Sequence, residues 1–257
     1  MLVCHPSGRH VRYGVAAALV SGLAGCGRAI APLVTSKASA VALTGGAGTS
    51  MVYLARSAHS VILIDLGWWG STKPITAALR ELDASPSQVT DVFLTHSHRD
   101  HVGAWRLVRH SRFHVAQAEV PLLLRQRRHR GWAPRFAERM KSSRLPAPNA
   151  IDVRPFGRDT AFAFGRDTPY AFLVPGHTAG STVYLFRGTL FLGDAATYTP
   201  WGGFGPARRA YSDDVGDAKA SLATLWPRLP RDAVRYVCTA HAHCAPYSDE
   251  FRRDVQK

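Results

Sequence analysis

Short apolar runs alternate with helix-like segments along most of the chain. Residues 50–55 and 60–65 are rich in β-branched and apolar side chains, which predicts two adjacent strands. From Pro74 onward, Ile75, Leu79 and Leu82 share one face, which predicts a helix. Further strands are predicted at 91–95, 182–186, 189–192 and 234–239, and further helices at 102–108 and 213–225. Strands and helices in two similar halves predict an α/β fold with a sheet-on-sheet core and helices outside.

An eight-residue near-repeat occupies residues 157–172. Gly-Arg-Asp-Thr-Ala-Phe-Ala-Phe is followed at once by Gly-Arg-Asp-Thr-Pro-Tyr-Ala-Phe. The unit is far too short to build a solenoid, so it predicts a hairpin with a Gly-Arg-Asp turn.

The first 25 residues have the features of a secretory signal. Arg9 and Arg12 precede an apolar run from Tyr13 to Leu23, which is too short to span a bilayer as a stable helix. The run ends in Leu-Ala-Gly-Cys26, which resembles the bacterial lipobox, where a signal peptidase cuts before a cysteine that becomes lipidated. We therefore expect a signal peptide at 1–25, a tether at 26–39 and one domain at 40–257. Plain secretion and an uncleaved buried segment are the alternatives.

The chain is strongly basic, with a net charge of +14, and loss of the signal would remove two arginines and no acid. Such a charge concerns partners and solubility rather than fold. An anionic substrate, an anionic membrane surface, nucleic acid and an arginine-rich composition bias each explain it. Of these, nucleic acid is the weakest, because an exported and lipidated protein fits a role in RNA processing poorly. We therefore expect a protein of the periplasm or cell envelope, held at a membrane through Cys26, with a small-molecule substrate and no nucleic acid.

Much of this charge lies in residues 125–144, where eight Lys and Arg residues accompany one acid, Glu138. Trp132 and Phe136 are interleaved with the arginines. We expect helices beside the mouth of the site, which would attract an anionic substrate or lipid headgroups. A solvated basic helix without such a role is the alternative.

Cys238 and Cys244 lie near the carboxyl end of the chain. In an oxidising compartment they could form a disulfide, although sequence does not show whether their geometry permits it. A buried Cys238 that only packs within a strand is an equal alternative.

A cluster of metal-binding residue types follows the predicted strand at 91–95. Three histidines and an aspartate, His96, His98, Asp100 and His101, fall within six residues. His96 and His98 point to the same side of an extended segment, because strand periodicity is two. Asp100 and His101 lie at the turn into the next helix, where they could face a neighbouring metal ion. Imidazole and carboxylate ligands suit zinc, and also iron or manganese.

This His-Ser-His-Arg-Asp-His segment resembles the HxHxDH signature of the metallo-β-lactamase superfamily. Later motifs of that family follow in order: Pro-Gly-His-Thr at 175–178, Gly-Asp-Ala at 193–195 and Thr-Ala-His at 239–241. Residues 64–67, Ile-Asp-Leu-Gly, resemble its early IDTG element, which supports the site from outside the ligand shell. The resemblance covers nearly everything from residue 50 to 243. It implies an αββα sandwich, with two mixed β-sheets flanked by helices.

The resemblance also implies a site for two divalent metal ions, for which we expect zinc, with iron or manganese as alternatives. The first ion would be bound by His96, His98 and His177, and the second by Asp100, His101 and His241, with Asp194 bridging both. The two ions would share a water or hydroxide. Asp100 would in addition orient this water or accept its proton, as the catalytic residue.

One departure from the family pattern concerns the last histidine. The family usually has glycine before it, whereas the sequence here is Ala240-His241-Ala242-His243. Both histidines lie on one side of an extended segment, so either could ligate, and the register of the preceding strand favours His241. The remaining histidines considered, at 59, 110, 114 and 129, match no ligand position and are interpreted as surface or packing residues.

The family resemblance implies hydrolysis of an ester, thioester, lactone or amide carbonyl by a metal-bound hydroxide. Asp194 favours glyoxalase II-like thioesterases and lactonases, because true β-lactamases generally lack the bridging aspartate. Tyr198 is one position late for the tyrosine of the lactonases, and packing is its simpler role. A β-lactamase, a mono-iron redox enzyme resembling persulfide dioxygenases and a catalytically silent metal-binding envelope protein are the alternatives. The complete second ligand set disfavours the mono-iron enzyme, and the intact ligands disfavour silence.

Overall fold

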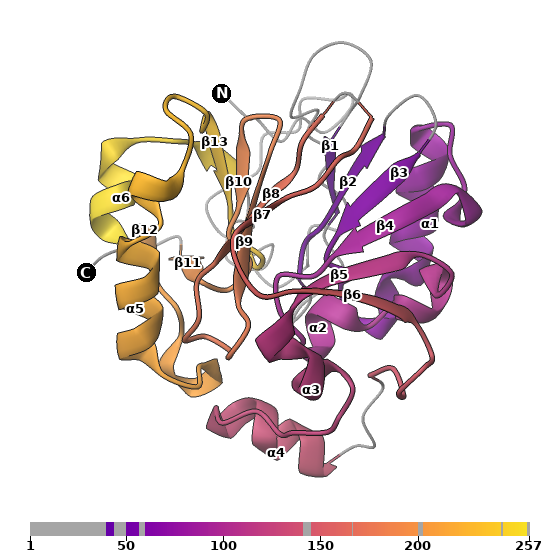
Figure 1. The fold of residues 1–257 in the computed structure, drawn as a ribbon, viewed down its shortest axis with the longest axis horizontal. Helices are drawn as coiled ribbons and strands as arrows, with labels where there is room; N and C mark the ends of the chain where they lie inside the picture. Colours follow the sequence, from indigo (N-terminus) through magenta and orange to yellow (C-terminus); the bar gives the residue numbers. More distant parts are fainter. Residues whose placement is uncertain are drawn as a thin grey trace, which may run out of the picture.

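The computed structural model describes residues 40–43, 50–56, 60–140, 145–165, 167–199, 203–242 and 244–255 (Figure 1). The predicted signal peptide (1–25) and tether (26–39) lie outside these residues, as do Cys26, His59 and His243. Within the described ranges, no helix is both long and apolar enough to cross a bilayer. The first element, β1, begins at Ala40.

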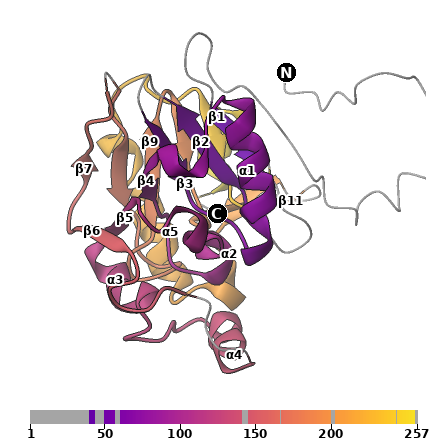
Figure 2. The same ribbon diagram turned by 90° about the vertical axis from the view of Figure 1, so that its right-hand side faces the viewer.

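A six-stranded mixed sheet is built from the first half of the described chain. In spatial order its strands are β1 (Ala40–Leu43), β2 (Val52–Arg56), β3 (Val61–Ile64), β4 (Val89–Phe93), β5 (Arg112–Ala116) and β6 (Asp152–Phe156). β1, β2 and β3 pair antiparallel, whereas β3 to β6 pair parallel. Parallel neighbours need a crossover connection. Helix α1 (Thr72–Glu81) supplies it between β3 and β4 and covers the outer face (Figures 1 and 2).

The second half of the described chain forms another six-stranded sheet. Its spatial order is β14 (Cys244–Pro246), β13 (Tyr236–Cys238), β10 (Thr189–Phe191), β9 (Thr182–Phe186), β8 (Tyr170–Leu173) and β7 (Thr160–Ala161). Only β10 and β13 pair parallel among these described strands. The crossover between them carries α5 (Val215–Ala223), which lies on the outer side of this sheet (Figure 1).

The two sheets pack face to face through aromatic and branched side chains. Tyr53, Ile62 and Phe93 of the first sheet form one buried cluster with Tyr184 and Phe191 of the second. The Tyr53 and Phe191 ring centroids lie 4.7 Å apart. Side chains alternate between the faces of a strand, so both faces of these strands are apolar and buried. Burial on both sides explains why strands such as β3 are continuous apolar runs.

Each outer face of the sandwich has its own helical cover. Ile75 and Leu79 of α1 pack in one cluster with Leu63 of β3. On the other side, Leu222 of α5 and Phe251 of α6 (Asp249–Asp254) join the cluster on the second sheet. The order helix, sheet, sheet, helix is the predicted αββα sandwich, which the structure confirms (Figure 1).

Smaller elements connect these layers. They are the α-helices α2 (Arg99–Val102), α3 (Val120–Leu123) and α4 (Trp132–Met140), the β11 (Ala196–Thr199) and β12 (Gly203–Pro206) hairpin, and 3₁₀ helices at Trp69–Ser71, Pro86–Gln88, Trp105–Val108, Gln117–Glu119, Arg209–Tyr211 and Trp226–Arg228. Helix α4, from the basic segment, projects from the lower end of the sandwich (Figure 2).

Most predicted elements are present, with boundaries shifted by about two residues or less. The helix predicted at 102–108 is wrong, because α2 ends at Val102 and Trp105–Val108 is a separate 3₁₀ turn. Backbone bonds from Leu66 to His101 (2.7 Å) and from Gly103 to Gly67 (2.7 Å) tie this segment to the loop after β3. The near-repeat does form a hairpin, but its ladder is short: β7 pairs β8 over two residues, and Phe164 bridges Asp167 around the turn.

Candidate metal centre

Four loops meet at one end of the sandwich, and each follows a strand of the central sheets. They follow β4, β8, β10 and β13 and carry all seven predicted ligands. Backbone hydrogen bonds join them in two pairs: Thr182 N, at the end of the loop after β8, donates to Thr95 O (2.9 Å), and Ala240 N donates to Gly193 O (3.1 Å). Segments far apart in sequence are therefore held together by the backbone itself.

The first group of side chains contains His96, His98, His177 and Asp194. Nε2 of His96 lies 3.0 Å from Nδ1 of His98, and Nε2 of His177 lies 3.2 Å and 3.1 Å from these two atoms. All three histidines are buried. Three ring nitrogens thus converge on one point from three directions.

Hydrogen bonds to Nδ1 of His177 and of His96 leave the Nε2 atom of each ring free to bind a metal ion. Ser212 Oγ donates to Arg208 O (2.8 Å), so it accepts the proton of His177 Nδ1 (3.1 Å). Thr95 Oγ1 donates to Asp65 (2.7 Å), so it accepts from His96 Nδ1 (3.1 Å). In each neutral ring Nε2 then carries a lone pair, as a metal ligand must.

Burial also keeps the three histidines of this first group neutral. It lowers the pKa of His96 and His98 well below the ordinary value, and neighbouring imidazoles add to the effect. Burial lowers the pKa of His177 to about 4, although Asp194 opposes the shift. At neutral pH these three rings can bind a cation without first releasing a proton.

The second group contains Asp100, His101 and His241. His241 Nε2 lies 3.4 Å from Asp100 Oδ2, and His101 Nε2 lies 3.8 Å from the same oxygen. Asp194, the carboxylate of the first group, also faces the second: its Oδ1 is 3.6 Å from His101 Nε2, and its Oδ2 is 3.6 Å from His177 Nε2 and 3.2 Å from His241 Nε2. One carboxylate therefore faces both groups, as the bridging position requires.

Electrostatics distinguish the second group from the first. Burial disfavours the charged form of His101, but Asp65, Asp100 and Asp194 outweigh burial and raise its pKa to about 10. Burial likewise opposes the charge of His241, and Asp194 outweighs it and raises the pKa of this ring. The pKa of Asp194 is held well below its usual range, because His241 and His101 outweigh the cost of burial. The carboxylates around the second group therefore stabilise positive charge at the place where a divalent cation would lie.

The donor set and its spacing fit zinc. Tetrahedral zinc with Zn–N bonds of about 2.0–2.1 Å places its ligand nitrogens about 3.3 Å apart, close to the 3.0–3.2 Å found for the three histidines. His101 Nε2 and Asp194 Oδ1 are buried and have no hydrogen-bond partner among the described residues. Buried polar atoms without partners are rare and costly. A cation between them would satisfy both atoms.

Gly193 allows the bridging carboxylate to approach the histidine loop. Its φ of +52° is a left-handed conformation that favours glycine, and a Cβ there would lie 2.7 Å from Thr95 Oγ1. The close approach of Thr95 and the positive φ thus explain why a glycine precedes Asp194 at the end of β10.

The structure brings together all seven residues that the sequence assigned to the metals: His96, His98, Asp100, His101, His177, Asp194 and His241. His241 lies in the second group, whereas His243 is outside the described residues, so the assignment between them stays a prediction. Tyr198 lies on β11 and packs edge-on against Phe204, with ring centroids 5.0 Å apart. Its proposed packing role therefore has a partner.

Sequence reasoning missed two buried groups next to the site. His129, interpreted as an ordinary surface or packing residue, is buried, and its ring centroid lies 4.6 Å from that of His98. Glu119 is completely buried and accepts hydrogen bonds from Ser97. A single acid in the mostly apolar stretch 115–124 was the available signal for Glu119, whereas His129 lies among arginines and gave none.

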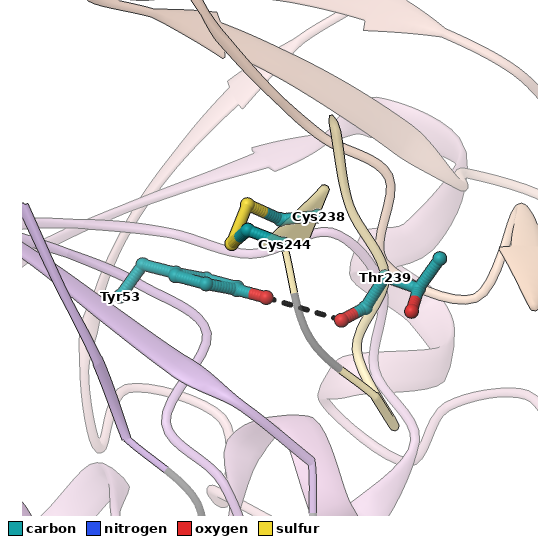
Figure 3. The surroundings of a disulfide bond; sticks show 4 residues. All are labelled: Tyr53, Cys238, Thr239 and Cys244. Carbon is teal, nitrogen blue, oxygen red and sulfur yellow. Dashed lines mark hydrogen bonds between the residues drawn. A yellow bond between two sulfur atoms is a disulfide. The ribbon is translucent and has the colours of Figure 1, made fainter. Parts of the chain in front are cut away.

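The loop that carries His241 is closed by a disulfide. Cys238 of β13 and Cys244 of β14 are bonded and directly opposite in the antiparallel ladder, which resolves the question that the sequence left open (Figure 3). Below the bond, Tyr53 Oη donates to Thr239 O (3.0 Å). Met51 N also donates to Ala240 O. The first sheet and the disulfide thus fix both ends of this loop.

The family model for the metallo-β-lactamase superfamily matches residues 45–241, which include every ligand described above. The chain therefore belongs to the metallo-β-lactamase superfamily. With its buried histidine and aspartate cluster, it is a metal-dependent hydrolase of that superfamily.

A curated relative is the "Probable polyketide biosynthesis zinc-dependent hydrolase BaeB" of Bacillus velezensis, which is 31% identical over 142 residues. The match covers 54% of this chain and 51% of the relative, so the chain spans about half the length of the curated relative it matches.

Solved structures share the fold. A metallo-β-lactamase from Pontibacter korlensis has a TM-score of 0.60 at 21% identity, and the match covers 83% of this chain and 91% of that one. An archaeal superfamily protein from Sulfolobus tokodaii has a TM-score of 0.60 at 18% identity, covering 86% of each chain. At such low identities the likeness concerns the fold alone.

Proposed function

We propose that this chain hydrolyses a carbonyl substrate, an ester, thioester, lactone or amide, with two zinc ions bound by the two ligand groups. The observation that carries this proposal is the place of Asp194, whose carboxylate lies within 3.6 Å of imidazole nitrogens from both ligand groups. The Bacillus velezensis relative is described as a probable zinc-dependent hydrolase, which supports zinc as the metal and hydrolysis as the reaction. Zinc in such a site lowers the pKa of a coordinated water towards about 7 and polarises a carbonyl oxygen.

The residues of this chain set the geometry for that chemistry. Asp194 fixes the separation of the two groups, and Asp65 and Ser212 hold His101 and His177 in the required tautomers. Asp100 and His241 are the more accessible ligands, with side-chain exposures of 22% and 29%, whereas His101 and His177 are almost fully covered. Substrate therefore enters on the Asp100 side. We assign to the Asp100 carboxylate the role of orienting the attacking water and accepting its proton.

The substrate that the surroundings favour is anionic. Helix α4 and the Arg209–Tyr211 turn flank the first ligand group: Arg99 Nη1 contacts Ala137 O (3.5 Å), and Ser212 contacts His177. Trp132 (68% exposed), Phe136 (58%) and Tyr211 (47%) lie on these elements. Exposed arginines accompany them at positions 128, 130, 135, 139, 208 and 209. Such a basic and aromatic edge raises the local concentration of an anionic, partly apolar substrate.

This assignment of charge has a direct test. The double variant Arg135→Ala/Arg139→Ala should raise KM for an anionic ester severalfold at low salt and leave KM for its neutral analogue unchanged. The same double substitution at Arg252 and Arg253, on the far side of the second sheet, is the control. An unchanged KM for the anionic ester in the α4 variant, or an equal rise in KM for both esters, would exclude substrate attraction by this edge.

We further propose that the protein is exported and held at a membrane through lipidated Cys26. The Cys238–Cys244 disulfide supports export, because such bonds persist in oxidising compartments. Cys26→Ser in the full chain should move the protein from the membrane fraction to the soluble envelope fraction. Unchanged membrane retention would remove the lipid anchor from the proposal.

The decisive experiment is a substrate panel on metal-quantified protein. Lactone, thioester, ester, phosphodiester and β-lactam substrates should be tested with His96→Ala as the inactive control. Turnover of a carbonyl substrate that requires about two metal ions per chain supports the proposal. One iron per chain with redox turnover would favour the mono-iron enzyme, turnover of β-lactams alone would make it a β-lactamase, and bound metal without turnover would make it a silent protein.

A further inference from the structure

A fully buried carboxylate lies behind the first ligand group and is a member of neither group. Glu119 ends the 3₁₀ turn Gln117–Glu119, directly before α3, and has no exposed surface. An uncompensated charge in this position would be costly, so its partners must account for its presence.

Both oxygens of Glu119 are fully used, and each holds a different ligand loop. Oε1 accepts from the backbone N (2.8 Å) and Oγ (2.5 Å) of Ser97, which lies between two ligands of the first group. Oε2 accepts from Thr178 Oγ1 (2.8 Å) and Gly180 N (2.8 Å), directly after His177. Charge-assisted bonds of this kind are shorter and stronger than neutral ones. One carboxylate therefore spans the two loops that carry His96, His98 and His177.

The backbone packing at this point is equally close. A Cβ on Gly180 would lie 2.5 Å from Glu119 Cβ and 2.6 Å from its backbone N. The third-ligand loop thus rests directly on the Glu119 turn, and only glycine permits this approach. The distance between the two loops is set by contact as well as by hydrogen bonds.

The same network continues outward to α4. Ser97 Oγ donates to Glu119, so it accepts from His129 Nε2 (3.1 Å), and His129 Nδ1 contacts Glu138 Oε1 (2.7 Å). Glu138 lies on α4. The basic segment is therefore connected to the back of the first ligand group through buried and partly buried polar contacts rather than through apolar packing alone.

We propose that Glu119 is a positioning residue that sets the spacing of the His96–His98 loop against the His177 loop, and thereby the affinity of the first ligand group for its metal ion. This role rests on the proposed function, because it requires that these histidines bind metal. Glu119 acts through the loops and does not itself touch metal or substrate.

The variant Glu119→Gln tests this role with almost no change in volume. Its amide NH₂ must face either the two Ser97 donors or the donors of Thr178 and Gly180, so one loop is necessarily released. Titration of the apo-protein with Co²⁺ against a chelator should show that the first ligand group of the variant binds Co²⁺ at least tenfold more weakly than that of wild type. The absorption bands of Co²⁺ bound there should shift. Gln117→Ala, an exposed change in the same turn, is the control and should match wild type.

The outcomes separate positioning from simple stabilisation. If Glu119→Gln lowers the Tm of the apo-protein but leaves the Co²⁺ affinity and the Co²⁺ spectrum as in wild type, the proposal is overturned. Ser97→Ala provides a second variant if Glu119→Gln does not fold, and should weaken Co²⁺ binding less, because the Ser97 backbone donor remains. Wild-type protein that binds no Co²⁺ would overturn this inference, whereas protein that binds Co²⁺ but hydrolyses nothing would overturn only the proposed function.

Discussion

Asp65 Oδ2 accepts a hydrogen bond from His101 Nδ1 at 2.8 Å, and the metal-facing nitrogen of His101 is thereby fixed as Nε2. The other oxygen of Asp65 accepts from Thr95 N (2.8 Å). Asp65 adopts a left-handed backbone conformation, with φ of +57°, which aspartate and asparagine tolerate better than most residues. A carboxylate outside both ligand groups thus decides the tautomer of a residue inside one of them.

We predict that Asp65→Asn weakens metal binding by the second ligand group about 10–100-fold. Asparagine keeps the backbone conformation, but its NH₂ must face either His101 Nδ1 or Thr95 N, so either the His101 tautomer or the position of the Thr95 backbone loses its support. Metal affinity is measured by competition titration with a chelator. Asp83→Asn is a matched control, since Asp83 also has a positive φ (+49°) but is exposed. Equal affinities in the two variants would contradict the role of Asp65.

The choice between His241 and His243 is tested by comparing their alanine variants. His241 lies 3.2 Å from Asp194 Oδ2, so His241→Ala should remove a direct ligand of the second group. The loss in kcat/KM should exceed the 10–100-fold typical of outer-shell partners, as it should for His96→Ala and His177→Ala. His243→Ala should retain most activity and metal. Reversed losses in the two variants would assign the ligand to His243.

Strand-end ligands were the part of the site that sequence could predict. His96, His98 and Asp100 follow an apolar strand within a few residues, and a local spacing of this kind needs no knowledge of the fold. The αββα layering also follows from local patterns, because strands buried on both faces are largely apolar runs, as β3 is throughout and β9 is after its first residue, Thr182.

Partners that depend on the packing of distant segments could not be predicted. Glu119 and Ser97 are 22 residues apart, and Thr95 and Asp65 are 30 apart, so no periodicity connects them. The helix predicted at 102–108 was wrong for the same reason, since backbone bonds to Leu66 and Gly67 determine where α2 ends. Cysteine pairing likewise depended on the register of β13 with β14, which the six-residue spacing alone does not specify.

Asp91 gives the stability of the first sheet a predictable pH dependence. It accepts two hydrogen bonds from Arg112 and one from His114 (2.6 Å), across β4 and β5. Burial raises its pKa, but the bonds from His114 and Arg112 outweigh burial and hold the pKa well below its usual range. The stabilisation is therefore present above the unfolded-state pKa of about 4 and is lost as pH falls towards the folded-state pKa.

Asp91→Asn should accordingly lower the free energy of unfolding at pH 7 by about 2 kcal/mol, less than a fully buried pair because Arg112 is half exposed. The difference from wild type should shrink below about pH 4. Urea unfolding at several pH values measures it. Asp152→Asn is the control, because its pair with Arg154 is exposed on both sides and should contribute little. A difference that does not vary with pH would contradict the assignment.

The Cys238–Cys244 bond should stabilise both the fold and the second ligand group. It closes a loop with a sequence separation of 6 that contains His241. Replacing both cysteines by alanine should lower the free energy of unfolding by about 2 kcal/mol, through the loop-closure entropy of the unfolded chain. It should also weaken metal binding by the second group but not the first, because the restraint on the His241 loop is lost. Tyr53→Phe removes the bond to Thr239 below the same loop and leaves the disulfide intact, so it separates the two restraints. Wild-type metal affinity in the double alanine variant would show that the sheets alone hold His241.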